Sequence, residues 1–349
     1  MGQHARVGAC GVSPRPRRSH ASYDESDVRV RPGRGTRPRS KIRPAHSGAV
    51  PGMVVAVDRG RYTCVIGDDD QVVTAMTARE LGRKAVVVGD RVGLVGDVSG
   101  GAGTLARIVR VHPRTSVLRR TADDDDDVER VIVANASHLV IVAAVADPEP
   151  RPRLIDRCLV AAFDSGMTPL LCVTKSDIGD PSELVGMYAP LDVPTVVTGA
   201  HDEQGIAQLR DALNGEISVL VGHSGVGKST LVNALVPGSD RAIGAVNVVT
   251  GRGRHTSTSA VALRLPDGGW VIDTPGIRSF GLAHVDPSTF ITAFADLAAE
   301  TDECPRGCTH GAGEPECALD DAREAGRLDP ARIDSFRRLL ASRERQAGD

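Results

Sequence analysis

Nine residues at positions 222–230, GHSGVGKST, match the phosphate-loop pattern G-x-x-x-x-G-K-[ST] and decide the expected fold of this chain. An apolar run, Ile217–Val221, predicts a strand before them, and Leu231–Val236 predicts a helix behind them. This setting directs backbone N–H groups and a helix N-terminus at a polyphosphate, which a chance glycine-rich turn would not do. The residues expected to line a nucleotide here are Gly222, His223, Ser224, Gly225, Val226, Gly227, Lys228, Ser229 and Thr230.

Magnesium coordination is expected from two segments of the chain. Within the loop, Lys228 would reach the β- and γ-phosphates, and the hydroxyl of Ser229 would hold Mg²⁺. Downstream, residues 251–259 (GRGRHTSTS) offer several hydroxyl groups. Either Thr256 or Thr258 would complete the Mg²⁺ shell and sense the γ-phosphate.

A second phosphate-facing motif, Asp-Thr-Pro-Gly at 273–276, ends a predicted strand. In an Asp-x-x-Gly motif that follows a phosphate loop, the carboxylate holds Mg²⁺ through water and the glycine N–H faces the γ-phosphate. We therefore expect Asp273 and Gly276 to line the γ-phosphate. The next residue is Ile277, whose side chain cannot orient an attacking water, so another group must do so.

A base-reading motif is expected directly after the predicted strand 168–173. Its residues are Thr174, Lys175, Ser176 and Asp177. The pattern is close to Asn-Lys-x-Asp, in which the carboxylate accepts from guanine N1–H and N2–H₂, donors that adenine cannot match. Thr174 stands where an Asn usually braces the phosphate loop. A second base-contacting segment follows another predicted strand, and there the N–H of Ala200 is expected to meet guanine O6. That segment comprises Thr198, Gly199 and Ala200.

The order of these motifs is unusual, because the base-reading residues precede the phosphate loop. In ordinary GTPases they follow it. A circular permutation keeps neighbouring strands together while it moves the chain termini. Strands that alternate with helices predict a largely parallel sheet. We therefore expect a circularly permuted P-loop α/β GTPase domain over residues 131–285, binding GTP and Mg²⁺.

Residues 47–115 show a different pattern, with five short apolar strands separated by Gly- and Asp-rich turns. Five strands at this spacing favour an OB-type β-barrel, a fold that often binds oligonucleotides. Arg79, Arg83 and Lys84 lie between the third and fourth strands, where they either contact phosphate or form a charged surface loop. The expected strands are Ala49–Val57, Tyr62–Ile66, Gln71–Thr77, Ala85–Val95 and Leu105–Val111.

Two charged segments flank the barrel. Residues 1–46 contain eleven Arg and Lys against three acidic residues and have almost no large apolar side chains. Such a segment is expected to be a disordered basic tail, which either contacts nucleic acid or is simply solvated. Residues 116–130 are expected to be an acidic linker because 123–127 is a run of five Asp, for which a metal site is the alternative.

The C-terminal segment, 286–349, is expected to be helical and to bind one structural zinc ion. Its candidate ligands follow the pattern C-x3-C-x-H-x6-C, and three thiolates with one imidazole suit tetrahedral Zn²⁺. Buried or disulfide-bonded cysteines are the alternative, but an odd total of seven cysteines favours a reduced compartment. The ligands are Cys304, Cys308, His310 and Cys317.

Together these motifs resemble the RsgA/YjeQ family of circularly permuted GTPases, over roughly residues 48–342. The likeness rests on the barrel, LIDR at 154–157, the base motif before the phosphate loop, GRGRHT at 251–256, DTPG and the Cys/His cluster. It implies GTP hydrolysis stimulated by the small (30S) ribosomal subunit, a role in late maturation of that subunit, and contact with 16S rRNA. It also points to His255 as the residue that orients the attacking water, for which a polar loop residue is the alternative.

Two other classes of protein are open at this point. One is an RNA-binding module that uses GTP as a structural ligand, and the other is an ATP-dependent kinase-like enzyme, against which Asp177 argues. The apolar content of 41% is enough for ordinary cores, and there is no apolar run of 18 residues to span a bilayer. The N-terminus lacks the apolar core of a signal peptide. We expect a cytoplasmic monomer without a membrane partner.

Overall fold

The computed structural model describes residues 46–81, 86–121, 129–238, 260–274, 282 and 285–343. The expected basic tail, apart from His46, lies outside these residues, as does the acidic run at 123–127. Among the described residues, no helix combines the length and the apolar character that crossing a bilayer requires. Other expected residues outside the described ranges are Arg83, Lys84, His255, Thr256, Thr258 and Gly276.

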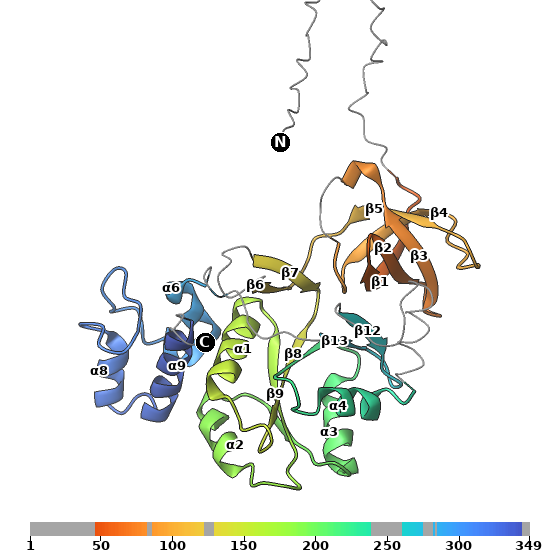
Figure 1. The fold of residues 1–349 in the computed structure, drawn as a ribbon. Helices are drawn as coiled ribbons and strands as arrows, with labels where there is room; N and C mark the ends of the chain where they lie inside the picture. The colour runs from red at the N-terminus through yellow and green to blue at the C-terminus, as the bar shows by residue number, and fades with distance from the viewer. Residues whose placement is uncertain are drawn as a thin grey trace, which may run out of the picture. The chain divides into compact units, whose positions relative to one another are not determined.

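Five strands near the start of the described chain close into a barrel (Figure 1). β1 pairs antiparallel with β2 and β4, β2 with β3, and β4 with β5, and a parallel pairing of β3 with β5 completes the ring. Inward-facing side chains such as Val54, Val73 and Ile108 are completely buried. The predicted OB-type barrel is confirmed. Its strands are β1 (Val50–Asp58), β2 (Arg61–Ile66), β3 (Gln71–Thr77), β4 (Arg91–Gly96) and β5 (Ala106–Val111), with a 3₁₀ turn η2 (Arg79–Leu81) after β3.

The fourth barrel strand is shorter than expected, because it begins at Arg91 rather than at Ala85. Gly89 adopts a φ of 87°, which favours glycine, and the carboxylate of Asp90 accepts a hydrogen bond from the N–H of Val87 at 2.8 Å. Arg114 donates to both oxygens of Asp90, at 2.7 and 2.8 Å. These contacts form a turn where the apolar pattern alone predicts continuous strand.

Six further strands form the GTPase sheet in the order β10-β9-β8-β11-β13-β12. The first five are mutually parallel, and β12 pairs antiparallel with β13 as a hairpin. β8 and β9 are continuous apolar runs because helices cover both faces of the sheet. The base-reading strand β9 therefore lies beside β8, which lies beside the phosphate-loop strand β11, as the permutation predicts. The strands are β8 (His138–Ala144), β9 (Thr168–Thr174), β10 (Thr195–Val197), β11 (Ile217–Val221), β12 (Val261–Arg264) and β13 (Trp270–Asp273).

Alternate residues of β8 enter two different cores. Leu139 and Ile141 belong to the core that contains residues of α1 and α2, whereas Val140 and Val142 belong to the core with α3 and α4. The parallel sheet thus has helices on each face, as an α/β fold requires. The helix α2 was not expected from the sequence. The four helices are α1 (Pro152–Asp164), α2 (Ser182–Tyr188), α3 (Glu203–Leu213) and α4 (Lys228–Leu235), with a 3₁₀ turn η3 (Ala189–Leu191) after α2.

The barrel and the GTPase domain share one continuous sheet, because barrel strand β1 also pairs with β12. Ala56 lies opposite Val261, Val261 lies opposite Asp273, and Asp273 lies beside Leu220 of the phosphate-loop strand. An ion pair of Asp70 with Arg264 at 3.1 Å adds a second contact between the two parts. The barrel is therefore two strands away from a proposed magnesium-binding carboxylate.

A β-hairpin occupies much of the stretch where an acidic linker was expected. β6 (Val117–Thr121) pairs antiparallel with β7 (Glu129–Ala134). Leu118 and Val133 are buried in the core that also contains α1. The linker prediction fails here because the run of Asp residues obscured short apolar segments on both of its sides. Residues 131–134, where the expected GTPase domain begins, also belong to this hairpin.

The C-terminal part is built from short helices around a cluster of Phe side chains. The ring of Phe294 lies 4.8 Å from Phe163 of α1 and 5.2 Å from Phe336 of α9 between centroids. The C-terminal segment is helical as expected over much of residues 287–298 and 318–342, but the helices in each stretch are interrupted. In the second, Gly326 has a φ of 67° and Asp329 caps the next helix. The elements are α6 (Pro287–Phe290), η4 (Ile291–Ala293), α7 (Ala295–Ala298), α8 (Ala318–Glu324) and α9 (Pro330–Ser342).

Candidate functional site

The phosphate loop joins β11 to α4, and its glycines adopt conformations that other residues rarely take. Gly222 has a φ of 152°, and a Cβ there would lie 2.3 Å from the carbonyl oxygen of Val142. Gly225 and Gly227 have φ angles of 86° and 96°, and α4 begins directly after Gly227. The glycine spacing read from the sequence therefore matches real backbone requirements. Ser229 and Thr230 are exposed in the first turn of α4.

Lys228 lies folded over the loop, with its side chain partly buried. Its Nζ donates to the carbonyl oxygens of Gly222 at 2.5 Å and His223 at 2.8 Å. Burial lowers the pKa of Lys228, and the neighbouring carboxylate of Asp273 opposes that shift. Burial raises the pKa of Asp273, which Lys228 opposes in turn. A cation and a carboxylate are thus close enough to interact at the phosphate loop, the pair of charges that a phosphate with Mg²⁺ requires.

Thr174 braces the phosphate loop with its hydroxyl group. Its Oγ1 donates to the carbonyl oxygen of Val226 at 2.7 Å, and it lies 3.3 Å from the carbonyl oxygen of Ala143. The side chain is buried, so these contacts are shielded from water. Although the sequence lacks the usual Asn at this position, a hydroxyl reaches from the base-reading strand to the loop.

Thr174→Val is expected to weaken GDP binding about tenfold, because it removes the donor to Val226 while it keeps the volume of the side chain. A lost buried hydrogen bond costs about 1–2 kcal/mol, and about 1.4 kcal/mol corresponds to a tenfold change in affinity. Titration with a fluorescent GDP analogue measures the effect. Thr174→Ser, which keeps the hydroxyl, is the matched control, and equal affinity of the two variants would contradict the bracing role.

The structure brings the two base-reading segments together. Oδ1 of Asp177 accepts a hydrogen bond from the N–H of Ala200 at 2.9 Å. A Cβ on Gly199 would lie 3.0 Å from the same oxygen, so a larger residue there would require the Asp177 side chain to shift slightly. Lys175 donates to the carbonyl oxygen of Asp147, in the loop that follows the neighbouring strand β8. Because Ala200 N–H already bonds Asp177, its predicted contact with guanine O6 requires this bond to be shared or released.

Thr274 is a positioning residue that the sequence reasoning did not single out. Its Oγ1 donates to the carbonyl oxygen of Leu220 in β11 at 2.6 Å, and its side chain is buried. This contact ties the start of the Asp-Thr-Pro-Gly motif to the phosphate-loop strand. The only signal in the sequence was a hydroxyl-bearing residue directly after Asp273.

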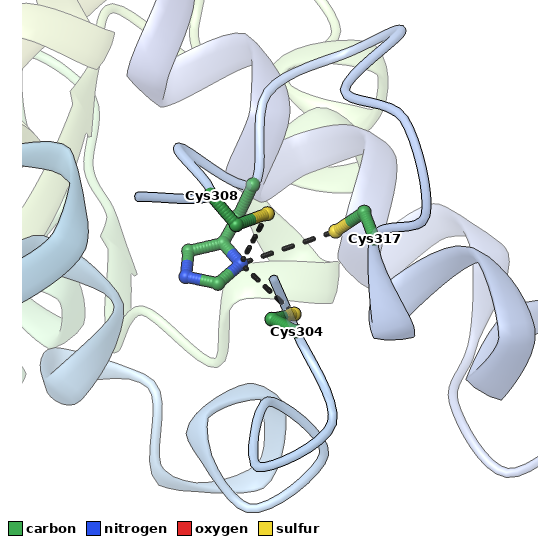
Figure 2. A group of neighbouring side chains, drawn as sticks. Cys304, Cys308 and Cys317 are labelled. Atoms are coloured by element: carbon green, nitrogen blue, oxygen red, sulfur yellow. Dashed lines mark hydrogen bonds between the residues drawn. The ribbon is translucent and has the colours of Figure 1, made fainter. Parts of the chain in front are cut away.

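The four Cys and His residues form one compact cluster. Figure 2 shows the three cysteine sulfurs around a single imidazole. Nδ1 of His310 lies 3.6 Å from Sγ of Cys304, 3.5 Å from Sγ of Cys308 and 3.9 Å from Sγ of Cys317. A tetrahedral Zn²⁺ with bonds of about 2.3 Å to sulfur and 2.0 Å to nitrogen needs N–S edges of about 3.5–3.6 Å. The donor set and its spacing therefore fit zinc.

The backbone around this cluster is organised by further polar contacts. Sγ of Cys304 accepts from the N–H of Ala318 at 3.3 Å. Arg337 of α9 donates to the carbonyl oxygen of His310 at 3.2 Å and to both oxygens of Asp320 in α8, at 2.7 and 2.8 Å. The cluster thus joins a loop to α8 and α9, which suits a structural rather than a catalytic metal.

Comparison with known proteins decides the family. The family model described as RsgA GTPase matches residues 111–283. A small ribosomal subunit biogenesis GTPase RsgA from Pseudomonas aeruginosa (strain LESB58) is 43% identical over 242 residues, which cover 67% of this chain and 70% of that protein. The chain belongs to the RsgA GTPase family. RsgA from Azotobacter vinelandii (strain DJ) is 40% identical over 265 residues, covering 74% of this chain and 75% of the relative.

Two solved structures share the fold. YjeQ from Thermotoga maritima has a TM-score of 0.64 at 27% identity, and the match covers 85% of this chain and 99% of that chain. YloQ, described as a circularly permuted GTPase, has a TM-score of 0.62 at 21% identity, covering 88% and 100%. The predicted family, the permuted GTPase fold and the assignment as a GTPase are confirmed.

Proposed function

We propose that this RsgA-family GTPase binds GTP with Mg²⁺ between the phosphate loop and residues 174–177, and that it acts in biogenesis of the small ribosomal subunit. The observation that carries the nucleotide site is the pair of contacts Thr174–Val226 and Asp177–Ala200. They link the phosphate loop and both base-reading segments into one site at the ends of β9, β10 and β11, with β8 between β9 and β11. The biological role is supported by relatives that are named small ribosomal subunit biogenesis GTPases.

The proposed binding mode follows from the contacts of the unliganded loop. Lys228 would exchange the carbonyl oxygens of Gly222 and His223 for phosphate oxygens. Ser229 and Thr256 would hold Mg²⁺ directly and Asp273 through water, and the ion would neutralise charge on the phosphates. Gly276 N–H would face the γ-phosphate. The role of His255 in orienting water stays a prediction from the sequence, since that residue lies outside the described ranges.

The barrel offers a surface that suits an RNA partner, and we propose that this partner is 16S rRNA. Arg61, Met76 and Arg107 lie in register on three adjacent strands, and all three are exposed. Two guanidinium groups beside an apolar side chain can contact phosphates and a base or sugar together. The pairing of β1 with β12 would then link RNA binding to the strand next to Asp273. We further propose that the protein is a cytoplasmic monomer.

Adding purified small ribosomal subunits is expected to raise GTP turnover more than about tenfold, since partner-supplied groups commonly accelerate GTPases by larger factors. Phosphate release measured with GTP, and with ATP as the control nucleotide, tests the proposal. Large ribosomal subunits serve as the control for non-specific RNA. Tight GTP binding without stimulated turnover would instead favour the alternative, an RNA-binding module with GTP as a structural ligand. A variant that lacks residues 1–46 shows whether the basic tail contributes.

A further inference from the structure

Helix α1 faces the phosphate loop on one side. Leu154, Ile155 and Cys158 of this helix line a small cavity together with three residues of the loop. Burial raises the pKa of the Cys158 thiol, and among its neighbours Lys228 is close enough to oppose that rise. A displacement of α1 would therefore change the packing against the phosphate loop. The loop residues that line the cavity are Gly222, His223 and Val226.

Another side of α1 packs against the C-terminal helix α9, which lies beside it in Figure 1. Asp156 of α1 is only 3% exposed, and its carboxylate lies 3.3 Å from Nε of Arg338 in α9. Arg338 also donates to the carbonyl oxygen of Met187 at 3.3 Å and stacks over the ring of Tyr188, 5.2 Å from its centroid. The Tyr188 hydroxyl donates to the carbonyl oxygen of Pro152 at 3.0 Å. One network thus joins α1, α2 and α9.

A neighbouring contact fixes the far end of α9 to the same helix. Arg157 donates from Nη1 to the carbonyl oxygen of Ser342 at 2.9 Å. Asp156 and Arg157 are the last two residues of the LIDR sequence, whose Leu154 and Ile155 line the cavity at the phosphate loop. Four consecutive residues therefore face two different parts of the molecule, the nucleotide site and the C-terminal helices.

The contact between α1 and α9 depends on Arg338, because the carboxylate of Asp156 is buried. A carboxylate removed from water is strongly disfavoured unless a cation and hydrogen-bond donors compensate its charge. Burial raises the pKa of Asp156, and Arg338 opposes that rise. Without Arg338, the chain relieves the unpaired charge by shifting α1, by admitting water or by taking up a proton, and the first two disturb the wall behind the phosphate loop.

We propose that Asp156 and Arg338 are positioning residues for nucleotide binding, because they hold α1 against the phosphate loop and make nucleotide affinity depend on the seating of α9. The inference rests on the nucleotide site proposed above. Because coupling between two sites is reciprocal, bound nucleotide also stabilises the docked position of α9. Typical coupling between sites changes affinity by about 5- to 150-fold.

Arg338→Met is expected to weaken binding of a fluorescent GDP analogue about tenfold at pH 8. The matched control is Arg323→Met, which removes an exposed ion pair of α8 with Asp334 of α9, and it should change affinity less than about twofold. The double variant Asp156→Asn/Arg338→Met removes the unpaired charge and should recover most of the affinity. Recovery separates positioning by the ion pair from general damage to α9.

The Arg338→Met defect should also shrink as the pH falls from 8 towards 6. Asp156 faces Arg338 from α9 and Tyr188 from α2, with Cys158 nearby on its own helix. Once Arg338 is gone, the raised pKa of Asp156 rises further, so protonation at lower pH relieves the buried charge. The double variant, which carries no carboxylate at position 156, should lack this extra pH dependence.

The outcomes separate the inference from the proposal on which it rests. Failure of the wild-type protein to bind GDP would reject the nucleotide site itself. Normal GDP binding by wild type and by Arg338→Met alike, or a double variant no better than the single one, would overturn the positioning role. If Arg338→Met does not fold, hydrogen exchange of wild-type α9 decides. Exchange should slow when GDP binds, and an unchanged rate would overturn the inference.

Discussion

Asp177→Asn is expected to lower the affinity for GTP by about a thousandfold and to raise the affinity for xanthosine 5′-triphosphate. The proposed role of the carboxylate is to accept hydrogen bonds from guanine N1–H and N2–H₂. An amide at this position places an NH₂ donor against those donors, and a buried mismatch of this kind is costly. Xanthine has a carbonyl oxygen in place of the 2-amino group, which the amide can pair.

The local structure should tolerate this substitution. Oδ1 of Asp177 accepts from Ala200 N–H, and an amide oxygen can accept the same bond. Asp180→Asn is the matched control, because that carboxylate accepts from the N–H and hydroxyl of Ser182 at the start of α2. Competition binding with GTP, ATP and xanthosine 5′-triphosphate measures the selectivity. Retained GTP affinity, together with no gain for the xanthine nucleotide, would remove Asp177 from base recognition.

Much of the fold could be predicted because its determinants are local in sequence. The barrel strands are short apolar runs between Gly- and Asp-rich turns, and β11 ends where the glycines of the phosphate loop begin. The four cluster residues lie within a short stretch, so their meeting needed no long-range information. Local patterns of this kind carry the strand period, the turn chemistry and the ligand set.

The remaining features depend on contacts between distant parts of the chain. Asp156 and Arg338 are separated by 182 residues, and the sequence around neither residue indicates that they pair. The pairing of Ala56 with Val261 joins the barrel to the GTPase domain, and no pattern in either strand indicates that it pairs with the other domain. The bracing role of Thr174 was obscured for a different reason: the hydroxyl performs a task that the usual motif assigns to an amide. Such functions follow from geometry rather than from residue type.

Cys317→Ser is expected to abolish stoichiometric zinc binding and to unfold the segment that carries α8. Cys317 immediately precedes α8, and the cluster joins this helix to the loop at 304–310. Binding of structural zinc contributes about 10–16 kcal/mol to folding in small zinc domains. Packing of the short helices alone is expected to supply less free energy than this, so the segment should unfold without the ion. The Phe cluster should keep α9 attached to α1, which confines the unfolding. Hydrogen exchange and metal analysis of the purified protein measure both effects.

Thr309→Val is the matched control for damage to the loop. Thr309 lies between two proposed ligands, but its hydroxyl donates to the exposed carboxylate of Glu314 rather than to the cluster. This variant should keep about one zinc per chain and normal exchange in α8, because the four donors remain. Less than about half a zinc per wild-type chain would reject the metal site. Equal exchange in wild type and Cys317→Ser would show that packing alone holds α8, since a structural ion must stabilise the elements that its ligands join.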